Sequence, residues 1–352
     1  MAEHEQRIVR VPLPLSLIRR MDELINQGVG GYQTRAELIR EAVEALVLEL
    51  SYERAPDEPV AWIAPLSDRQ DARTSSIDTA LRSYGPGDTI DLEATGLRMP
   101  PSTPTTISDG HGEVIDEPLF GLHNRDYPSL WAARHLASLT ANGLVDVTEF
   151  YESLVASAWR FGERLLTMEK LAGTKLSALF PTNRNKPESS AEAFLAFAVG
   201  SITVAGSRIR VSGPLYVWRV CQVIKEDERI LIGLTVPGYK LLTSLEGLSL
   251  SLPHPAELAV QFFSHLRVYA PSDWWGFKTL LQAVGERIDR LGLVDVFRRE
   301  RPQWSDNKCG STVAGYVARA REWGLIEPKQ INGNYVLTQF GKQQVEYLSG
   351  DL

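Results

Sequence analysis

Apolar residues recur with a period of two over residues 6–13, which predicts a strand with one buried face. One face of this strand carries Val9, Val11 and Leu13, and the other carries Ile8, Arg10 and Pro12. The period then becomes helical over residues 14–27 and, after a glycine-rich turn, over residues 34–50. One strand and two short helices cannot close a hydrophobic core. We therefore expect the strand to pair with the strand of a second chain.

This order of elements resembles the ribbon-helix-helix family of MetJ and Arc type. The resemblance covers roughly residues 5–50 and rests on spacing. The matching features are the strand residues 7–14, then Leu17, then Met21 and Asp22, then the stretch from Gly31 to Ala42 with a helix-capping box at residues 34–37. The resemblance implies a homodimer in which two strands form an antiparallel ribbon that enters the major groove of double-stranded DNA.

The resemblance also implies which residues meet DNA. The outward strand face would touch base edges, and the second helix would point its N-terminus at a phosphate. The strand residues are Arg7, Ile8, Arg10 and Pro12, and the helix residues are Thr34 and Arg35. Arg10 is the best hydrogen-bond donor on the strand face, and guanine is its best target. Residues 1–50 hold six Arg and eight acids, a net charge of −2, so a module that dimerises without reading DNA is the alternative.

Composition places the chain among ordinary globular proteins. At 352 residues it is long enough for two or three domains. It has no apolar run near twenty residues and no signal peptide, which predicts a cytoplasmic protein with no membrane partner. The two cysteines stand far apart and the six histidines show no ligand spacing, so we expect no metal and no cofactor.

Residues 51–116 differ from the rest in charge and composition. They are rich in Pro, Ser, Thr, Asp and Gly, and residues 51–115 hold five Arg and eleven acids. Most of the chain's net charge of −7 therefore lies in this segment. The pattern predicts a semi-ordered acidic connector. A short strand at 60–64 and a helical turn at 77–84 are candidates within it.

The rest of the chain is apolar and mostly helical in period. Helices are predicted at 130–139, 147–168 and 191–202, and strands at 203–211 and 229–234. The overall fold class is then mainly α with small β elements. The expected domains are residues 1–50, the connector 51–116, a helical winged-helix-like domain at 117–255 and a second winged-helix-like domain at 256–352.

Two segments about a hundred residues apart repeat one pattern. An apolar strand is followed by Leu-Thr-x-x-Gly and then a helix, first at residues 229–245 and again at 333–348. The threonine is suited to cap the helix, and the glycine permits close packing. Residues 139–143 carry the same string without a preceding strand, so the string alone is a weak signal.

The second copy of this pattern resembles a winged helix-turn-helix. Helices are predicted at 274–284, 291–298 and 312–323, and a hairpin at 329–336 turns at Asn332 and Gly333. The resemblance implies that the third helix contacts DNA through Arg319 and Arg321, with Lys329 nearby. The alternative is that both arginines form surface pairs with Glu322 and its neighbours. The first copy, with residues 213–224 as its helix, fits less well.

No enzyme signature stands out in the sequence, since no nucleophile, base and orienting group share a recognisable spacing. The leading hypothesis is a sequence-specific DNA-binding transcriptional regulator that acts as a homodimer. An architectural or partition-type protein that coats or bridges DNA is the first alternative. A protein-interaction scaffold that binds no DNA is the second.

Overall fold

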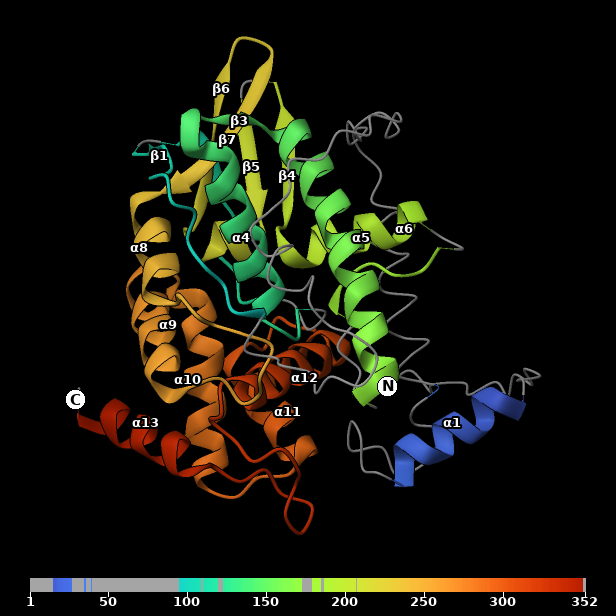
Figure 1. The fold of residues 1–352 in the computed structure, drawn as a ribbon. Coiled ribbons are helices and arrows are strands. Elements are labelled where there is room, and N and C mark those ends of the chain that lie inside the picture. The colour runs from blue at the N-terminus through green and yellow to red at the C-terminus, as the bar shows by residue number, and fades with distance from the viewer. Residues whose placement is uncertain are drawn as a thin grey trace, which may run out of the picture. The chain divides into compact units, whose positions relative to one another are not determined.

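The computed structural model describes residues 15–26, residues 35 and 39, and residues 95–350 except 109, 120–122, 173–178, 185–186 and 207. The chain divides into two compact units, Met1–Asp57 and Glu58–Leu352 (Figure 1). The predicted strand at 6–13 lies outside the described residues, as do the candidate elements at 60–64 and 77–84.

In the smaller unit, helix α1 spans Leu15–Asn26. Its apolar positions recur at helical spacing, so one side is shielded while the other faces solvent. Met21 is buried, whereas Arg19 and Arg20 are exposed. The predicted helix over 14–27 is therefore confirmed within one residue at each end. Arg35 and Ile39, inside the second predicted helix, are also helical.

The first part of the larger unit is built on three long helices. They are α4 Tyr127–Leu139, α5 Val147–Ala172 and α6 Pro187–Ala198. The first two confirm the predicted helices. The third ends before residue 202 because Gly200, at φ 118°, leaves the helical region and a strand begins at the next residue.

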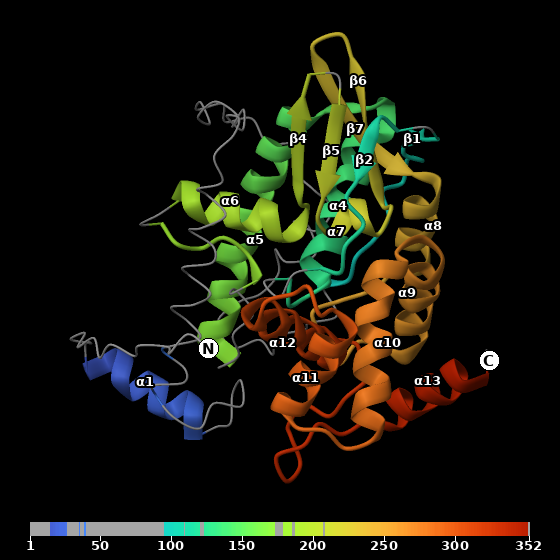
Figure 2. The same ribbon diagram turned by 180° about the vertical axis from the view of Figure 1, so that it is seen from behind.

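Two small sheets lie at one end of this unit (Figures 1 and 2). The first contains β1 Thr106–Ile107, β3 Val145–Asp146, β6 Cys221–Glu226 and β7 Arg229–Thr235. Strand β7 pairs parallel with β1 and antiparallel with β3 and β6. The second sheet has the order β2-β5-β4, with β2 Gly112–Val114, β5 Arg208–Ser212 and β4 Ser201–Ala205.

These sheets correct two expectations. The predicted single strand at 203–211 is a hairpin, because the chain turns at Gly206, which has φ 61°. Residues 106–107 and 112–114 belong to the sheets, although their composition predicts a connector. The first segment pairs with residues 234–235 and the second with residues 209–211, and no local pattern reveals such distant partners.

After the sheets, the rest of the larger unit is mostly helical. They are α8 Val236–Ser244, α9 Ala256–Tyr269, α10 Pro271–Gly285, α11 Arg290–Glu300, α12 Asp306–Glu322 and α13 Gln339–Gly350. The three helices predicted between residues 274 and 323 are thus present, in order. The predicted hairpin follows: Ile331 and Asn334 exchange backbone hydrogen bonds of 2.9 and 3.1 Å. Its turn residues Asn332 and Gly333 have φ 52° and 78°, as a tight hairpin requires.

One hydrophobic core runs through both predicted C-terminal domains. Phe262 of α9, for example, stacks on Trp323 at 4.5 Å and meets Trp218 edge-on at 5.2 Å. The sheets occupy one end of the unit and helices α10 to α13 the other (Figure 2). The segments 117–255 and 256–352 therefore pack as parts of one compact unit.

The repeated pattern in the sequence corresponds to a repeated structure. Thr235 and Thr338 each donate a backbone N–H to the carbonyl of an aliphatic residue, Val220 at 2.9 Å and Leu325 at 3.1 Å. Each threonine hydroxyl accepts a hydrogen bond from the backbone N–H of the glycine three residues later, at 2.9 and 3.0 Å. Both predicted caps are confirmed. We call residues 218–238 and 323–341 the two Trp-to-Gly motifs.

The two motifs also begin alike. Trp218 and Trp323 end a helix, and the next residue, Arg219 or Gly324, takes a positive φ of 55° or 67°. In the first copy, however, the helix is only α7 Pro214–Val217, so the predicted helix over 213–224 is wrong. Strand β6 begins at Cys221 and takes the rest of that segment. The third string, at residues 139–143, has no such geometry, because Thr140 bonds back to Leu136 at a helix end.

Candidate nucleic-acid interface

The residues expected to read DNA in the smaller unit are mostly outside the described residues. These are Arg7, Ile8, Arg10, Pro12 and Thr34. Arg35 is described, and its guanidinium forms two hydrogen bonds with the carboxylate of Asp22 in α1, at 2.5 and 2.6 Å. The hydrogen bond to Asp22 raises the pKa of Arg35, and both side chains remain accessible to solvent. To contact a DNA phosphate, Arg35 must therefore give up its hydrogen bonds with the Asp22 carboxylate.

In the larger unit, α12 is the helix expected to contact DNA, and most of it is buried. Ser305 caps its N-terminus by accepting from the N–H of Lys308. The core side of α12 holds Cys309, Thr312, Val313, Tyr316, Val317 and Ala320. Its exposed or half-buried stripe holds Asn307, Gly310, Ser311, Ala314, Ala318 and Arg321. Among these six described residues, Arg321 is the only one with a long basic side chain, and it lies near the end of the helix.

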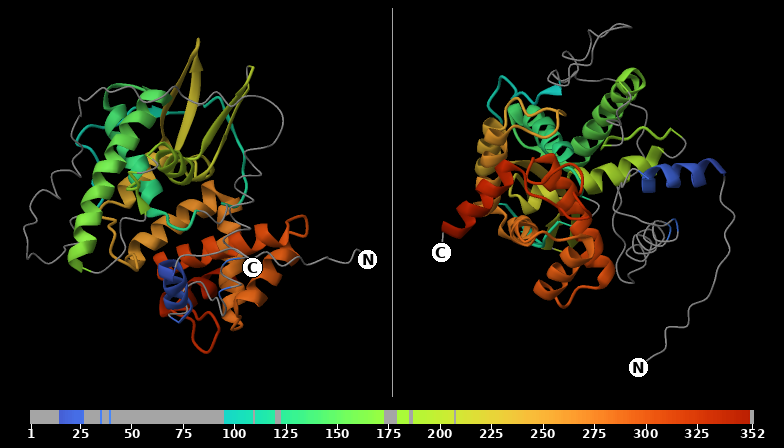
Figure 3. Two further views of the ribbon diagram at one scale, coloured as in Figure 1. Left: turned by 90° about the vertical axis from the view of Figure 1, so that its right-hand side faces the viewer. Right: turned by 90° about the horizontal axis from the view of Figure 1, so that it is seen from below.

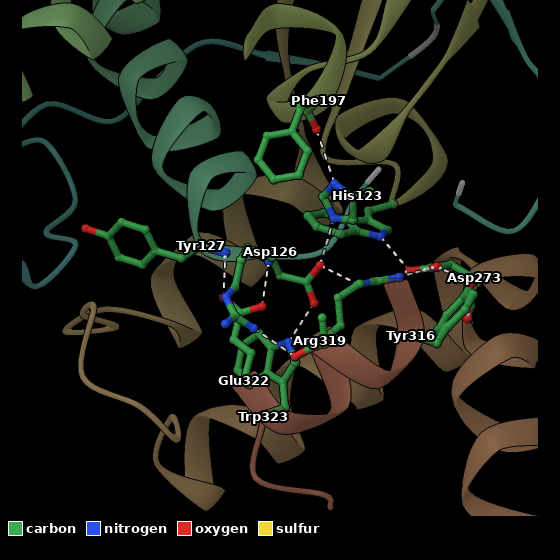
Figure 4. Close-up of polar contacts among 12 residues, drawn as sticks. His123, Asp126, Tyr127, Phe197, Asp273, Tyr316, Arg319, Glu322 and Trp323 are labelled. Atoms are coloured by element: carbon green, nitrogen blue, oxygen red, sulfur yellow. Dashed lines mark hydrogen bonds and ion pairs between the residues drawn. The ribbon is translucent and has the colours of Figure 1, made fainter. Parts of the chain in front are cut away.

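Arg319 points the other way and is 1% exposed. Its Nε donates to Asp126 at 2.7 Å, and its Nη1 and Nη2 donate to Asp273 at 2.8 and 2.7 Å (Figure 4). The expectation that Arg319 contacts DNA is therefore wrong, and so is the alternative of a surface pair. Residues two apart on a helix face nearly opposite sides, so Arg319 and Arg321 cannot share one surface.

Both aspartates receive further donors. Asp126 accepts from the indole N–H of Trp323 at 2.6 Å and lies 2.8 Å from Nε2 of His123. Burial raises the pKa of Asp126, but the charge of Arg319 and the contact with His123 outweigh it and hold the pKa at about 2. This carboxylate is ionised at neutral pH, and it lies at the start of α4 without capping that helix through its side chain.

Asp273 lies in the first turn of α10 and is fully buried. It accepts from the indole N–H of Trp218 at 2.8 Å and from the hydroxyl of Tyr316 at 2.6 Å. Burial lowers the pKa of Arg319, yet the charges of Asp126 and Asp273 raise it well above its ordinary value. Arg319 therefore joins the starts of α4 and α10 as a permanent cation.

Glu322 completes this buried network from the end of α12. It accepts from the backbone N–H groups of Asp126 at 2.7 Å and Tyr127 at 3.2 Å, and lies 3.3 Å from Nε2 of His254 (Figure 4). Every carboxylate in the network thus has protein partners. Among the described residues no group of three or more His, Cys, Asp or Glu is arranged to hold a metal ion. This network of Asp126, Asp273, Arg319 and Glu322 joins residues 117–255 to residues 256–352, and we call it the buried clasp.

The hairpin after α12 carries Lys329, which is exposed, and Ile331, which is 51% exposed at the tip. It projects at the end of the unit opposite the β6–β7 hairpin (Figures 1 and 3). The tip of the β6–β7 hairpin instead presents Glu226, Asp227 and Glu228. Negative charge repels phosphate. The hairpin with Lys329 is therefore the better suited of the two to lie near DNA.

Arg298, Arg299 and Arg301 form a basic cluster before α12, and two of them contact neighbouring side chains. Arg298 contacts Asp295 at 2.6 Å and Asp306 at 2.8 Å. The guanidinium of Arg301 lies 4.5 Å from the ring centroid of Trp275. The two carboxylates offset the charge that Arg298 offers to a phosphate, whereas the ring of Trp275 leaves Arg301 with its full charge.

Sequence reasoning missed the partners of Arg319. Asp126 and Asp273 look like ordinary residues at helix starts, and they meet Arg319 across 193 and 46 positions of the chain. No family model matches this chain, and no curated protein or solved structure matches it either. None of the helices in the described part of the chain is long and apolar enough to cross a membrane.

Proposed function

We propose that this protein is a sequence-specific DNA-binding transcriptional regulator that acts as a homodimer through its N-terminal strand. The observation that carries the proposal is the spacing of strand, helix, turn and helix over residues 7–42. Helix α1 lies where that spacing predicts it, and Arg35 and Ile39 are helical where the second helix is predicted. In the proposed dimer, Arg10 reads a base in the major groove while Thr34 and Arg35 meet the backbone.

The larger unit has a supporting role in this proposal. Arg319 is committed to the buried clasp, so DNA contacts of this unit fall to Arg321 and Lys329. Two cations contribute modest, strongly salt-dependent affinity. The N-terminal ribbon therefore carries the sequence specificity, and the larger unit adds contacts to the backbone.

Binding-site selection from a random duplex library with the full-length protein tests the proposal. A regulator enriches one short motif, with half-sites related by the symmetry of the dimer. Footprints then separate the two DNA-binding functions: a regulator protects a discrete site, whereas an architectural or partition-type protein protects extended stretches without a motif. Absence of binding to any duplex at low salt contradicts both and leaves the protein-interaction scaffold.

A further inference from the structure

A second arginine, Arg125, reaches the outer stripe of α12 that carries Arg321. Arg125 precedes α4, and its Nη1 donates to the backbone carbonyl of Ala318 at 2.9 Å. Ala318 and Arg321 are three residues apart, so they share one face of the helix. The guanidinium of Arg125 is thereby held on the same face as Arg321, although the two residues are far apart in the chain.

The acids next to both arginines in sequence turn away from them. Asp126 follows Arg125, and its carboxylate binds Arg319 in the core. Glu322 follows Arg321, and its carboxylate binds backbone N–H groups at the start of α4. The two cations are thus left together without a carboxylate from either adjacent residue.

Within the described part of the chain, one hydrogen-bond donor of Arg321 has no acceptor. The Nε of Arg321 is buried and has no acceptor there. Its guanidinium carbon lies 5.8 Å from the ring centroid of Tyr335, in the hairpin after α12. Burial lowers the pKa of Arg321; Tyr335 opposes this effect, and the like charge of Arg125 adds to it. A buried donor without an acceptor and two neighbouring cations both cost free energy.

We propose that Arg125 and Arg321 form a binding site for one phosphate group, next to the ring of Tyr335. The planar fork of each guanidinium fits two oxygens of a tetrahedral oxyanion, and the anion offsets the repulsion between the cations. A backbone phosphate of DNA and free inorganic phosphate offer the same oxygens. Binding of a DNA phosphate at this site rests on the proposed function, whereas binding of free inorganic phosphate does not.

Thermal unfolding of the full-length protein tests the site without DNA. Inorganic phosphate, exchanged for chloride at constant ionic strength, should raise the midpoint of wild-type unfolding, since a ligand of the folded state stabilises it. Arg125→Gln and Arg321→Gln should each abolish most of this rise. Arg208→Gln, which removes an exposed arginine from β5, is the matched control and should keep it. In phosphate-free buffer, Arg321→Gln should unfold at the same temperature as the wild type or higher, which separates loss of the site from loss of the fold.

Binding to the selected duplex over a series of salt concentrations tests DNA as the source. Loss of one arginine–phosphate contact should weaken binding roughly tenfold and lower the slope of log affinity against log salt by about 1. We expect this of Arg125→Gln and Arg321→Gln, and of the double variant to about the same extent, because both arginines serve one phosphate. Arg208→Gln should bind like the wild type.

The two arms give distinct outcomes. Loss of both the phosphate-induced rise and the DNA contact supports a site for a DNA phosphate. Loss of the rise with unchanged DNA binding, or with no DNA binding by the wild type, supports a site for free phosphate and contradicts the DNA source. The proposal is overturned if both arginine variants bind DNA like the wild type and phosphate affects the unfolding midpoint of all three proteins equally. An equal rise in all three and no rise in any of them both count as this result.

Discussion

Trp218 and Trp323 occupy equivalent positions in the two Trp-to-Gly motifs, and each donates its indole N–H to a carboxylate from the opposite part of the unit. Trp218 reaches Asp273 at the start of α10, and Trp323 reaches Asp126 just before α4. Arg319 binds both carboxylates. The two motifs are therefore joined reciprocally, and this polar network links residues 117–255 to residues 256–352 alongside their shared hydrophobic core.

The glycine that ends each motif is required by a close approach of the backbone. A Cβ on Gly341 would lie 2.0 Å from the carbonyl oxygen of Leu325, and one on Gly238 would lie 2.0 Å from that of Val220. Gly341→Ala and Gly238→Ala should each lower the free energy of unfolding by about 1–3 kcal/mol, the usual cost of overpacking. Urea unfolding measures the effect.

Gly310 is the control for this prediction. It lies inside α12, and a Cβ there would meet nothing within 4 Å. Gly310→Ala should raise the free energy of unfolding by roughly 0.5–1 kcal/mol, because alanine is the better helix former. Equal effects of alanine at residues 310 and 341 would contradict the assigned role of the motif glycine.

Arg319 and Arg321 should respond oppositely to the same substitution. Arg319→Met leaves two buried carboxylates without their cation and should cost about 3–5 kcal/mol of unfolding free energy. Arg321→Met removes a half-buried cation that faces another and should change the unfolding free energy little. Urea unfolding of both variants provides the measurement. If Arg319→Met proved as stable as Arg321→Met, the buried clasp would contribute nothing to the fold.

The sequence predicts local features of this protein well and long-range pairing poorly. The Asn332–Gly333 turn and the threonine caps follow from local chemistry, and the structure has them. The opposite orientation of Arg319 and Arg321 also follows from their spacing. Which of the two points inward does not, because it depends on Asp126, which lies 193 positions away.

His135 should make stability depend on pH. It is 4% exposed, and its Nε2 lies 3.0 Å from the Ser153 hydroxyl oxygen. Burial, with the charges of Arg134 and Arg160, lowers its pKa from 6.5 to about 4. Between these values the unfolded chain binds a proton that the folded chain does not, so stability falls as pH falls. The loss from this residue is on the order of 3 kcal/mol between pH 6.5 and pH 4.

The pH effect is isolated by comparing His135→Gln with the wild type in urea unfolding at several pH values. The variant lacks this titration, so the stability difference between the two proteins should shift in favour of the variant as pH falls from 6.5 to 4. His111→Gln, which replaces an exposed histidine, controls for the loss of a surface imidazole. A constant difference between wild type and His135→Gln across this range would show that folding does not shift the pKa of His135.

Arg10 and Val11 should separate DNA reading from dimerisation, because neighbouring residues in a strand face opposite sides. Arg10→Ala removes the main donor of the proposed ribbon face and should weaken binding to the selected site by about ten- to hundredfold while the dimer persists. Val11→Asp places a charge in the proposed ribbon core and should disrupt the dimer. Fluorescence anisotropy with the selected duplex measures the first effect, and analytical ultracentrifugation measures the second. Unchanged affinity of Arg10→Ala would exclude base reading by the strand. A Val11→Asp protein that stays dimeric would instead place the dimer interface in another part of the chain.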